Sequence, residues 1–224
     1  MGFSLKRYLL SKLSYAQVGV TPQEWKRLRF TYAQHGEDII AEALLPEEYG
    51  FYVEIGAFHP VSISNTYLFY RKGWRGIVVD PAPAVAALFK KRRPEDIMLA
   101  YAVSPEENVK KFGLMNGAES NGLIGANETA GSGTPKQVIE VKCLRLETIL
   151  NKYLPPQQKI DFLSVDTEGH DFHVLTSNNW EKYRPRLVAV EDFQTLEESE
   201  ICKFMGSKGY RLILSAKITR FFME

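Results

Sequence analysis

The sequence predicts one α/β domain in which a mostly parallel β-sheet is covered by helices on both faces. Short apolar runs alternate with segments of helical periodicity along most of the chain, which is typical of parallel βαβ units. With 45% hydrophobic and 25% charged residues, the chain can build a sizeable core. The last two apolar runs, at 209–214 and 217–222, are joined by only two residues. Strands joined so closely are expected to be antiparallel.

The chain is predicted to consist of an N-terminal extension and one main domain. Residues 1–30 are predicted to form a helical extension, and residues 31–224 a single domain without internal repeats. Residues 113–137 interrupt the alternation with many Gly, Asn, Ser and Thr residues. Such long loops inside compact domains are usually functional or flexible, so we predict a lid. Its flanks, 108–112 and 138–143, favour a hairpin.

Local signals define the elements of the first half. Apolar residues at helical spacing and the break at Pro46 predict the first helix. Gly56 closes the first β-rich run, and Ser62 and Ser64 offer N-caps to the next helix. Pro83 suits the first turn of another helix. The predicted elements are helix 37–45, strand 51–55, helix 62–72, strand 76–79, helix 83–92 and strand 97–103.

The alternation of strands and helices resumes after the glycine-rich loop. Apolar periodicity predicts three further helices, with buried-type strands between them. The strand at 187–190 is followed by two acidic residues, Glu191 and Asp192. The predicted elements are helix 146–152, strand 160–165, a helix from 171 to 176, strand 187–190, helix 196–207, strand 209–214 and strand 217–222.

Charge and cysteine content exclude several classes of protein. A net charge of +1 gives no field that would attract nucleic acid, and no apolar run reaches the ~20 residues of a bilayer span. Cys143 and Cys202 form no CxxC motif, which favours a reducing, cytoplasmic location. Residues 1–13 are compatible with a short amphipathic helix. That helix would pack on its own domain or on another subunit of an oligomer, or would contact a membrane surface.

Acidic residues occur at the ends of three predicted strands. Glu54, Asp80 and Asp166 close the first, second and fourth strands. Ligands of open α/β sheets bind at this carboxyl edge. A dinucleotide is disfavoured because the run from Gly56 to Val61 lacks the second and third glycines of GxGxxG.

S-adenosylmethionine fits this pattern better, because it has no phosphate and carries an ammonium, a sulfonium and a ribose diol. Glu54 would lie near the cationic methionine end, and Asp80 would accept hydrogen bonds from the ribose hydroxyls. Taken alone, Glu54 is also compatible with an ion pair facing a helix, and Asp80 with a turn cap before Pro81. Their combination at this spacing favours a nucleoside site.

Further residues around the same edge are predicted to bind the cofactor. Gly56, followed by Ala57, lets the chain turn under it. Pro81, Ala102 and Val103 follow the second and third strands and would supply an apolar slot for adenine. These apolar residues are also compatible with plain packing.

The motifs resemble those of the FkbM family of S-adenosylmethionine-dependent methyltransferases. From about Tyr32 to the C-terminus, the chain carries in order YAQHGEDII, FYVEIGAFHPVSISNTYLFYRKGWRGIVVDPAP, AVS and IDFLSVDTEGHDFHVL. It departs from the family at Phe58-His59-Pro60, where Asn and Gly are usual. The resemblance implies a Rossmann-like class I methyltransferase fold, with seven strands and an antiparallel last strand. It also implies O-methylation, often of sugar hydroxyls during biosynthesis of surface polysaccharides, glycolipids or natural products.

The first motif of the resemblance adds residues to the predicted site. Gln34 and Asp38 become candidate cofactor contacts. Asn65, in the second motif, lies in the first turns of a helix that opens at the site and is a candidate contact to cofactor or acceptor; it is also compatible with a merely exposed position beside the caps. His35 is a candidate substrate contact, and its alternative role is to cap the helix from Glu37.

Methyl transfer to a hydroxyl requires alignment of the acceptor, exclusion of water and removal of a proton. Asp166, His170 and His59 are the candidate catalytic residues, with His170 attractive because imidazole titrates near neutrality. Asp166 would be the base, orient a base or bind acceptor hydroxyls, and His170 is also compatible with an exposed position at a helix start. Glu168 and Asp192 are candidate contacts to the small-molecule or glycan acceptor.

Two other functions remain open from the residues alone. Asp166, Glu168 and Asp192 would make a plausible oxygen-rich set for Mg²⁺, although no ligand spacing demands it. A metal-dependent hydrolase or transferase using Asp166, Glu168 and His170 is therefore one alternative. The other is a non-catalytic methyltransferase-like subunit.

Overall fold

The structure is a computed structural model that describes residues 19–25, 27–115, 121–124 and 134–224. The chain forms two units, Met1–Phe30 and Thr31–Glu224. In the first unit, α2 (Pro22–Trp25) begins with a capping box. The Thr21 backbone N–H donates to Glu24 Oε2 at 2.7 Å, and the Glu24 N–H donates to Thr21 Oγ1 at 3.2 Å. The helix predicted over residues 1–13 lies outside the described residues.

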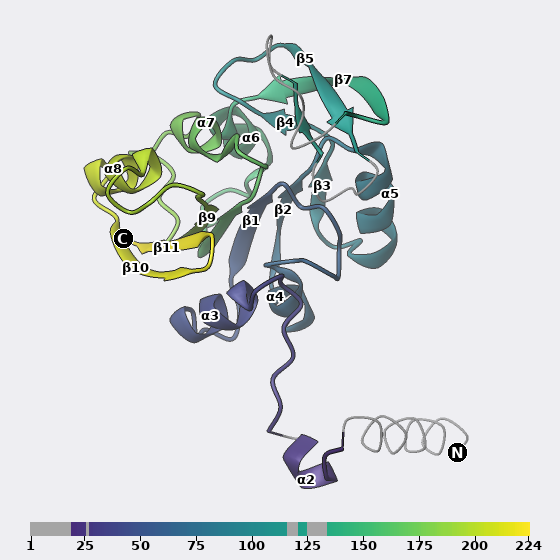
Figure 1. The fold of residues 1–224 in the computed structure, drawn as a ribbon, viewed down its shortest axis with the longest axis vertical. Helices are drawn as coiled ribbons and strands as arrows, with labels where there is room; N and C mark the ends of the chain where they lie inside the picture. The colour runs from purple at the N-terminus through teal and green to yellow at the C-terminus, as the bar shows by residue number, and fades with distance from the viewer. Residues whose placement is uncertain (1–18, 26, 116–120, 125–133) are drawn as a thin grey trace. The chain divides into compact units, whose positions relative to one another are not determined.

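The second unit contains a seven-stranded sheet of order β10-β11-β9-β8-β1-β2-β3 (Figure 1). All neighbours pair in parallel except β11, which is antiparallel to both β9 and β10. A mostly parallel sheet is therefore confirmed. The strands are β1 (Phe51–Ile55), β2 (Arg75–Val79), β3 (Ile97–Leu99), β8 (Phe162–Val165), β9 (Leu187–Glu191), β10 (Arg211–Ala216) and β11 (Thr219–Met223).

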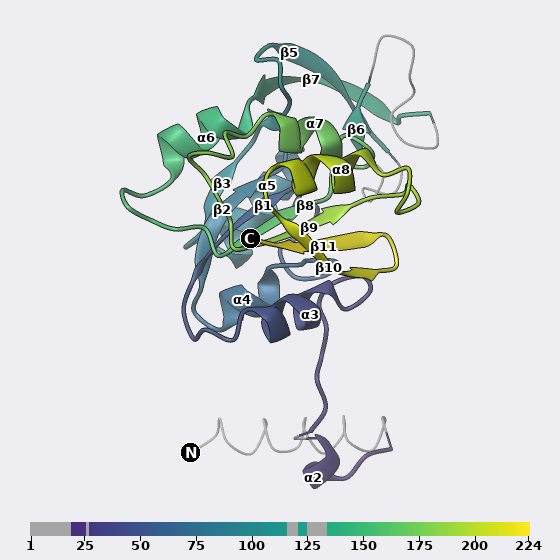
Figure 2. The same ribbon diagram turned by 90° about the vertical axis from the view of Figure 1, so that its left-hand side faces the viewer.

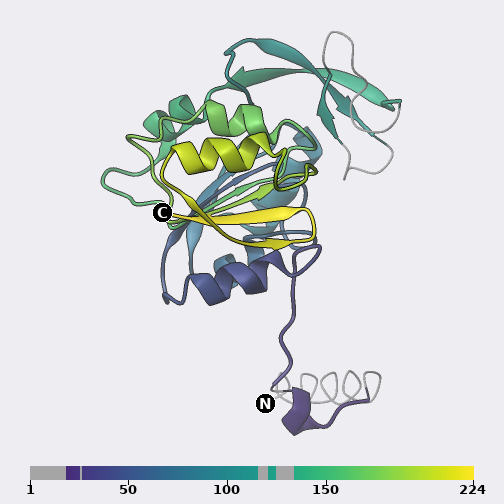
Figure 3. The same ribbon diagram turned by 60° about the vertical axis from the view of Figure 1, so that its left-hand side comes forward.

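Helices cover both faces of this sheet, as predicted (Figures 2 and 3). One face packs against α6 (Leu146–Tyr153), α7 (Asp171–Thr176) and α8 (Glu200–Ser207). The other face packs against α3 (Glu37–Leu44), α4 (Tyr67–Arg71) and α5 (Pro83–Arg92).

Strand β1 feeds both cores because successive side chains point to opposite faces of a sheet. Val53 and Ile55 join the core under α6, α7 and α8, whereas Tyr52 joins the core on the opposite face. All five residues of β1 are buried.

A second, four-stranded sheet of order β4-β7-β5-β6 lies beyond one end of the main sheet (Figure 1). The long strands β5 and β7 pair antiparallel, with Lys111 opposite Glu140. This is the hairpin expected around the glycine-rich segment. The strands are β4 (Ala102–Val103), β5 (Val109–Leu114), β6 (Gly122–Leu123) and β7 (Gln137–Leu144).

Three predicted elements need correction. The strand predicted at 97–103 is two strands, because the chain leaves the main sheet after Leu99 and pairs with β7 from Ala102. The helix predicted from Ser62 begins at Tyr67, and Ser64 Oγ accepts a hydrogen bond from the Tyr67 N–H at 3.2 Å. Helix α8 begins at Glu200 instead of 196, with Ser199 as its side-chain N-cap.

In the described parts of the chain, no helix is long and apolar enough to cross a membrane.

Candidate functional site

A pocket lies at the carboxyl edge of the main sheet. Its walls include Gly56 after β1, Asp80 after β2, Asp166 after β8 and Glu191 at the end of β9. Residues Gly122–Leu123 of β6 line it from the second sheet. The structure thus brings Asp80 and Asp166, predicted from separate strands, into one pocket.

Gly56 is the point where the turns after β1 and β8 meet. Its backbone has a φ of 82°, which favours glycine. A Cβ atom at this position would lie 1.6 Å from the carbonyl oxygen of Asp166. The Gly56 N–H donates to the Val79 carbonyl at 2.9 Å, and the Asp166 N–H donates to the Ile55 carbonyl at 3.0 Å. These bonds hold the ends of β1, β2 and β8 together under the pocket.

Asp80 presents a buried carboxyl group to the pocket. Its Oδ2 accepts a hydrogen bond from the Phe58 N–H at 3.2 Å, and its Oδ1 accepts one from the Ala82 N–H at 2.8 Å. Burial raises the pKa of Asp80 to about 6. The side chain is thus both the turn cap and the pocket residue that the sequence suggested, because each carboxylate oxygen has a second lone pair.

The half of the pocket near β2 and β4 is largely apolar. Pro81, Ala102 and Val103 line it, as the sequence predicted for an adenine slot. Tyr101 and Leu123 complete this wall. Gln34, another predicted residue, also lines the pocket.

Three pocket residues other than glycine have a left-handed backbone. The φ angles are 39° at Phe58, 52° at Ile63 and 56° at Glu168. This conformation is unfavourable for most side chains, above all for a β-branched residue such as Ile63. Such strain persists where the surrounding structure enforces it, and it concentrates at functional sites.

The half of the pocket near β8 and β9 is acidic. Asp166, Glu168 and Glu191 line it together with His170. Burial, reinforced by the neighbouring carboxyl groups, raises the pKa of both Asp166 and Glu191 above the ordinary carboxyl range. Glu191 is only 7% exposed. A positively charged group would relieve the repulsion within this acidic half.

A tight loop presents His170. Asp171, the first residue of α7, accepts hydrogen bonds from the Thr167 N–H at 2.8 Å and from the Gly169 N–H at 3.1 Å. The His170 ring stacks on His173 with centroids 4.5 Å apart. Burial is the largest cause that lowers the pKa of His170, to about 4. His170 therefore presents a neutral imidazole at pH 7.

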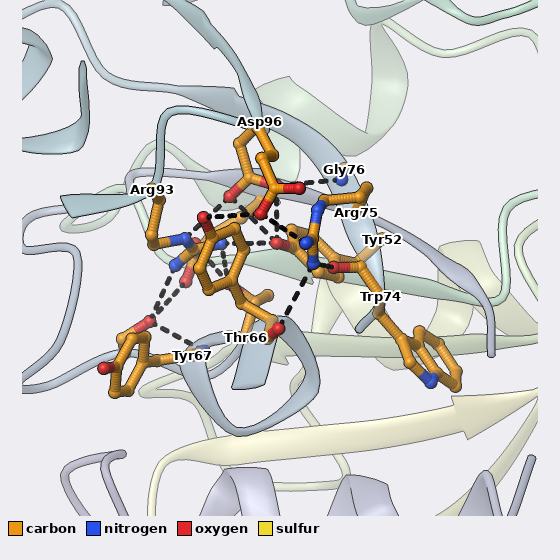
Figure 4. A network of polar contacts seen from close by, with 12 residues as sticks. Tyr52, Thr66, Tyr67, Trp74, Arg75, Gly76, Arg93 and Asp96 are labelled. Carbon is orange, nitrogen blue, oxygen red and sulfur yellow. Dashed lines mark hydrogen bonds and ion pairs between the residues drawn. The ribbon is translucent and has the colours of Figure 1, made fainter. Parts of the chain in front are cut away.

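Glu54 does not line the pocket. Its side chain lies on the face of the sheet that packs against α3, α4 and α5. There its Oε2 accepts a hydrogen bond from Thr66 Oγ1 at 2.6 Å and lies 3.5 Å from Arg93 Nη1. The Arg93 guanidinium also donates to Asp96 Oδ2 at 2.7 Å and to the Tyr52 hydroxyl at 2.9 Å (Figure 4). This is the ion-pair role that was the alternative for Glu54.

Other predicted residues make local contacts away from the pocket lining. Asn65 donates to Ser164 Oγ at 3.0 Å. His59 Nδ1 accepts backbone N–H bonds from Val61 and Ser62, each at 3.1 Å, and so closes its own turn. Asp38 Oδ2 accepts from the Tyr32 N–H at 2.7 Å.

The remaining predicted residues are also engaged elsewhere. His35 Nε2 lies 2.6 Å from Lys217 Nζ, and Ala57 is buried without lining the pocket. Asp192 Oδ2 accepts from Ser199 Oγ at 2.6 Å and lies 3.4 Å from Arg220 Nε. Asp192 therefore anchors α8 and β11.

Sequence reasoning missed Glu191 as a pocket residue. The predicted strand ended at Val190, which left two successive carboxylates in a loop with no means of telling them apart. The structure extends β9 to Glu191, so that this residue takes a strand position at the edge. The missed signal is the period-2 alternation of a strand, continued by one residue.

The part of the chain that the structure describes contains no group of three or more His, Cys, Asp or Glu side chains arranged to hold a metal ion.

The acidic half predicts a pH-dependent stability. Asp166 and Glu191 retain protons in the folded protein at pH values where the unfolded chain has lost them. The free energy of unfolding should therefore fall as the pH rises from about 4, the ordinary carboxyl value, through neutrality. Each unit by which a pKa is raised corresponds to about 1.4 kcal/mol. Urea unfolding measured over this pH range checks the direction.

The double variant Asp166→Asn, Glu191→Gln is the control for this prediction. All other titrating groups are common to both proteins, so the difference between the two pH profiles isolates the pair. If the native chain and the double variant showed the same pH dependence of unfolding, the raised pKa values of Asp166 and Glu191 would be contradicted.

A comparison with protein families gives one match: the family model described as the methyltransferase FkbM domain matches residues 54–212. The matched segment includes Gly56, Asp80, Asp166 and Glu191, the four residues that mark the ends of the strands around the pocket. No curated protein and no solved structure gives a significant match.

Proposed function

Because the chain belongs to the FkbM methyltransferase family, we propose that it is an S-adenosylmethionine-dependent O-methyltransferase whose acceptor is a hydroxyl of a sugar, glycan, glycolipid or natural product. The family predicted from the sequence motifs is confirmed, and with it a methyltransferase. The cofactor, the reaction at oxygen and the acceptor class are the proposal.

One observation carries the choice of cofactor. A single pocket combines the Asp80 carboxylate and an apolar wall at one end with a cluster of carboxyl groups at the other. The diol, the adenine and the positive charges of S-adenosylmethionine match these features. The turn after Gly56 has Phe58 and Val61 where a pyrophosphate would need glycines, so these residues fit the methyl donor better than a dinucleotide.

The chain's own residues divide the work of the reaction. Asp80 would hold the ribose hydroxyls, and Ala102 and Val103 the adenine. The bound cofactor supplies an electrophilic methyl group. Asp166 and His170, in the acidic half, would orient the acceptor hydroxyl, and its proton would pass to a carboxylate of this half.

The segment 113–137 is proposed to act as a lid, although its residues 116–120 and 125–133 lie outside the described residues. Its described part includes Asn121, Gly122 and Leu123, which line the pocket. Closure of such a segment would exclude water from the reacting methyl group.

We also propose a cytoplasmic location. Cys143 and Cys202 are both unpaired, as expected in a reducing compartment.

The proposal is tested by calorimetric titration with S-adenosylhomocysteine, the neutral product analogue of the cofactor. We expect binding to the native chain, and an affinity reduced about 10- to 100-fold in Asp80→Asn, as for the loss of hydrogen bonds to a charged group. Glu140→Gln, an exposed acid on β7, is the control and should bind as the native chain does. Failure of the native chain to bind S-adenosylhomocysteine would reject the proposed cofactor.

A further inference from the structure

Two buried polar atoms in the acidic half of the pocket lack a partner. Glu191 Oε2 and His170 Nε2 have no hydrogen bond to any described residue. Both residues line the pocket. Leaving a buried polar atom unsatisfied costs about 1–3 kcal/mol, and native proteins satisfy nearly all such groups. Both atoms are therefore free to form a hydrogen bond with a polar group that enters this half of the pocket.

Glu191 lines the pocket, whereas its neighbour Asp192 is held by contacts outside the pocket. Glu191 ends β9 and pairs with Thr219 of the antiparallel strand β11, which fixes its backbone position. The next residue, Asp192, is held by Ser199 and Arg220. Of these two successive carboxylates, only Glu191 lines the pocket and has an oxygen without a partner.

The other acidic groups around Glu191 differ from it in what they contact. The carboxylate of Asp171 is occupied by the hydrogen bonds of its own loop. Asp166 and Glu168, the two further acidic groups that face Glu191, add negative charge beside it. An unengaged carboxyl oxygen in a cluster of like charges tends to gain a proton.

We propose that Glu191 is the catalytic residue that receives the proton of the acceptor hydroxyl. This inference rests on the proposed function and adds the group that completes its chemistry. As the acceptor oxygen forms its bond to the methyl carbon, the carbon–sulfur bond breaks and sulfur keeps the electron pair. The positive charge of the bound cofactor would favour the ionised form of Glu191, which keeps its proton in the free protein. The O–H bond breaks, and its proton passes to this carboxylate. The positive charge of the sulfonium is thereby replaced by the neutralised carboxyl group, so charge balances within the pocket.

Sinefungin tests this placement without knowledge of the acceptor. In this analogue an amine-bearing carbon replaces the methylated sulfur, so that its amine lies where the methyl group meets the acceptor. S-adenosylhomocysteine shares the rest of the molecule and lacks that amine. The ratio of the two affinities therefore reports on the group beside the methyl position.

We expect the native chain to bind sinefungin at least about tenfold more tightly than S-adenosylhomocysteine, as for one hydrogen bond to a charged group. In Glu191→Gln, sinefungin affinity should fall about 10- to 100-fold, whereas the affinity for S-adenosylhomocysteine should change less than about threefold. Glu197→Gln, an exposed acid just beyond β9, should leave both affinities unchanged. Retained binding of S-adenosylhomocysteine also shows that the variant folds.

Three other results are informative. Equal binding of the two ligands by the native chain would overturn the role of Glu191, whether or not the variant folds. An equal loss of both affinities in Glu191→Gln would overturn it too, because the residue would then hold the shared part of the ligand. Binding of neither ligand by the native chain would instead reject the proposed function.

Discussion

Replacing Gly56 by alanine is expected to abolish binding of S-adenosylhomocysteine and to lower the free energy of unfolding by about 2–5 kcal/mol. About 1–2 kcal/mol of this arises from the left-handed backbone, which alanine adopts reluctantly, and about 1–3 kcal/mol from overpacking. The added Cβ would lie 1.6 Å from the Asp166 carbonyl oxygen, so the turns after β1 and β8 must separate. Urea unfolding and calorimetric titration measure the two effects.

Two glycines in the same sheet-and-helix unit provide matched controls. Gly209 has the same φ of 82° as Gly56, but a Cβ there meets its nearest atom at 3.7 Å. Gly209→Ala should therefore show the backbone effect alone, about 1–2 kcal/mol. Gly206 lies inside α8 with nothing within 4 Å, so Gly206→Ala should be neutral or stabilising by up to about 1 kcal/mol. If Gly56→Ala were no worse than Gly209→Ala, the close approach of the two turns would be refuted.

Arg93→Met is expected to destabilise the protein by about 3–5 kcal/mol. Arg93 is completely buried and forms ion pairs with two carboxylates. One is Asp96 (Figure 4), and the other is Glu54. Removing one partner of a buried ion pair is strongly unfavourable because the opposite charge remains without compensation. Its hydrogen bonds to Tyr52 and Thr66 are lost as well.

The neighbouring arginine supplies the control for this prediction. Arg92 is exposed, so Arg92→Met should change the free energy of unfolding by less than about 0.5 kcal/mol. Arg93→Lys should recover only part of the loss, since lysine lacks the planar fork that reaches several acceptors at once. Urea unfolding of the three variants measures the order of their free energies of unfolding. A loss below about 1 kcal/mol in Arg93→Met would show that the network is not a stabilising centre.

The alternation of apolar runs was sufficient to predict the main sheet, because burial on both faces leaves a strong local signal. Strand β1 is an example, with every residue buried. The second sheet was harder to predict from the sequence. The residues from Ile97 to Val103 read as one strand, and only their pairing shows that Ala102–Val103 joins β7, about 40 positions further along the chain. Pairing partners so distant in sequence leave no local pattern.

The site was predictable where it depends on topology and not where it depends on side-chain direction. Asp80 and Asp166 follow the ends of parallel strands, so the rule of the carboxyl edge located both. Glu54 lies inside β1, on the same face as Tyr52 two residues earlier, and it meets Arg93 there. Period-2 alternation would have indicated this face of the strand. The sequence does not show that the buried guanidinium of Arg93 lies on the same face.

The order of strands has a consequence for how the protein is made. Strand β11 is the last of the seven to leave the ribosome, yet it lies between β9 and β10. Until it emerges, the valine-rich edge of β9 stays uncovered and β10 has no neighbour among the described strands. An uncovered strand edge invites pairing with other nascent chains. Synthesis of this protein therefore passes through a stage at which six of the seven strands are made, while the place of the seventh, between β9 and β10, is still empty.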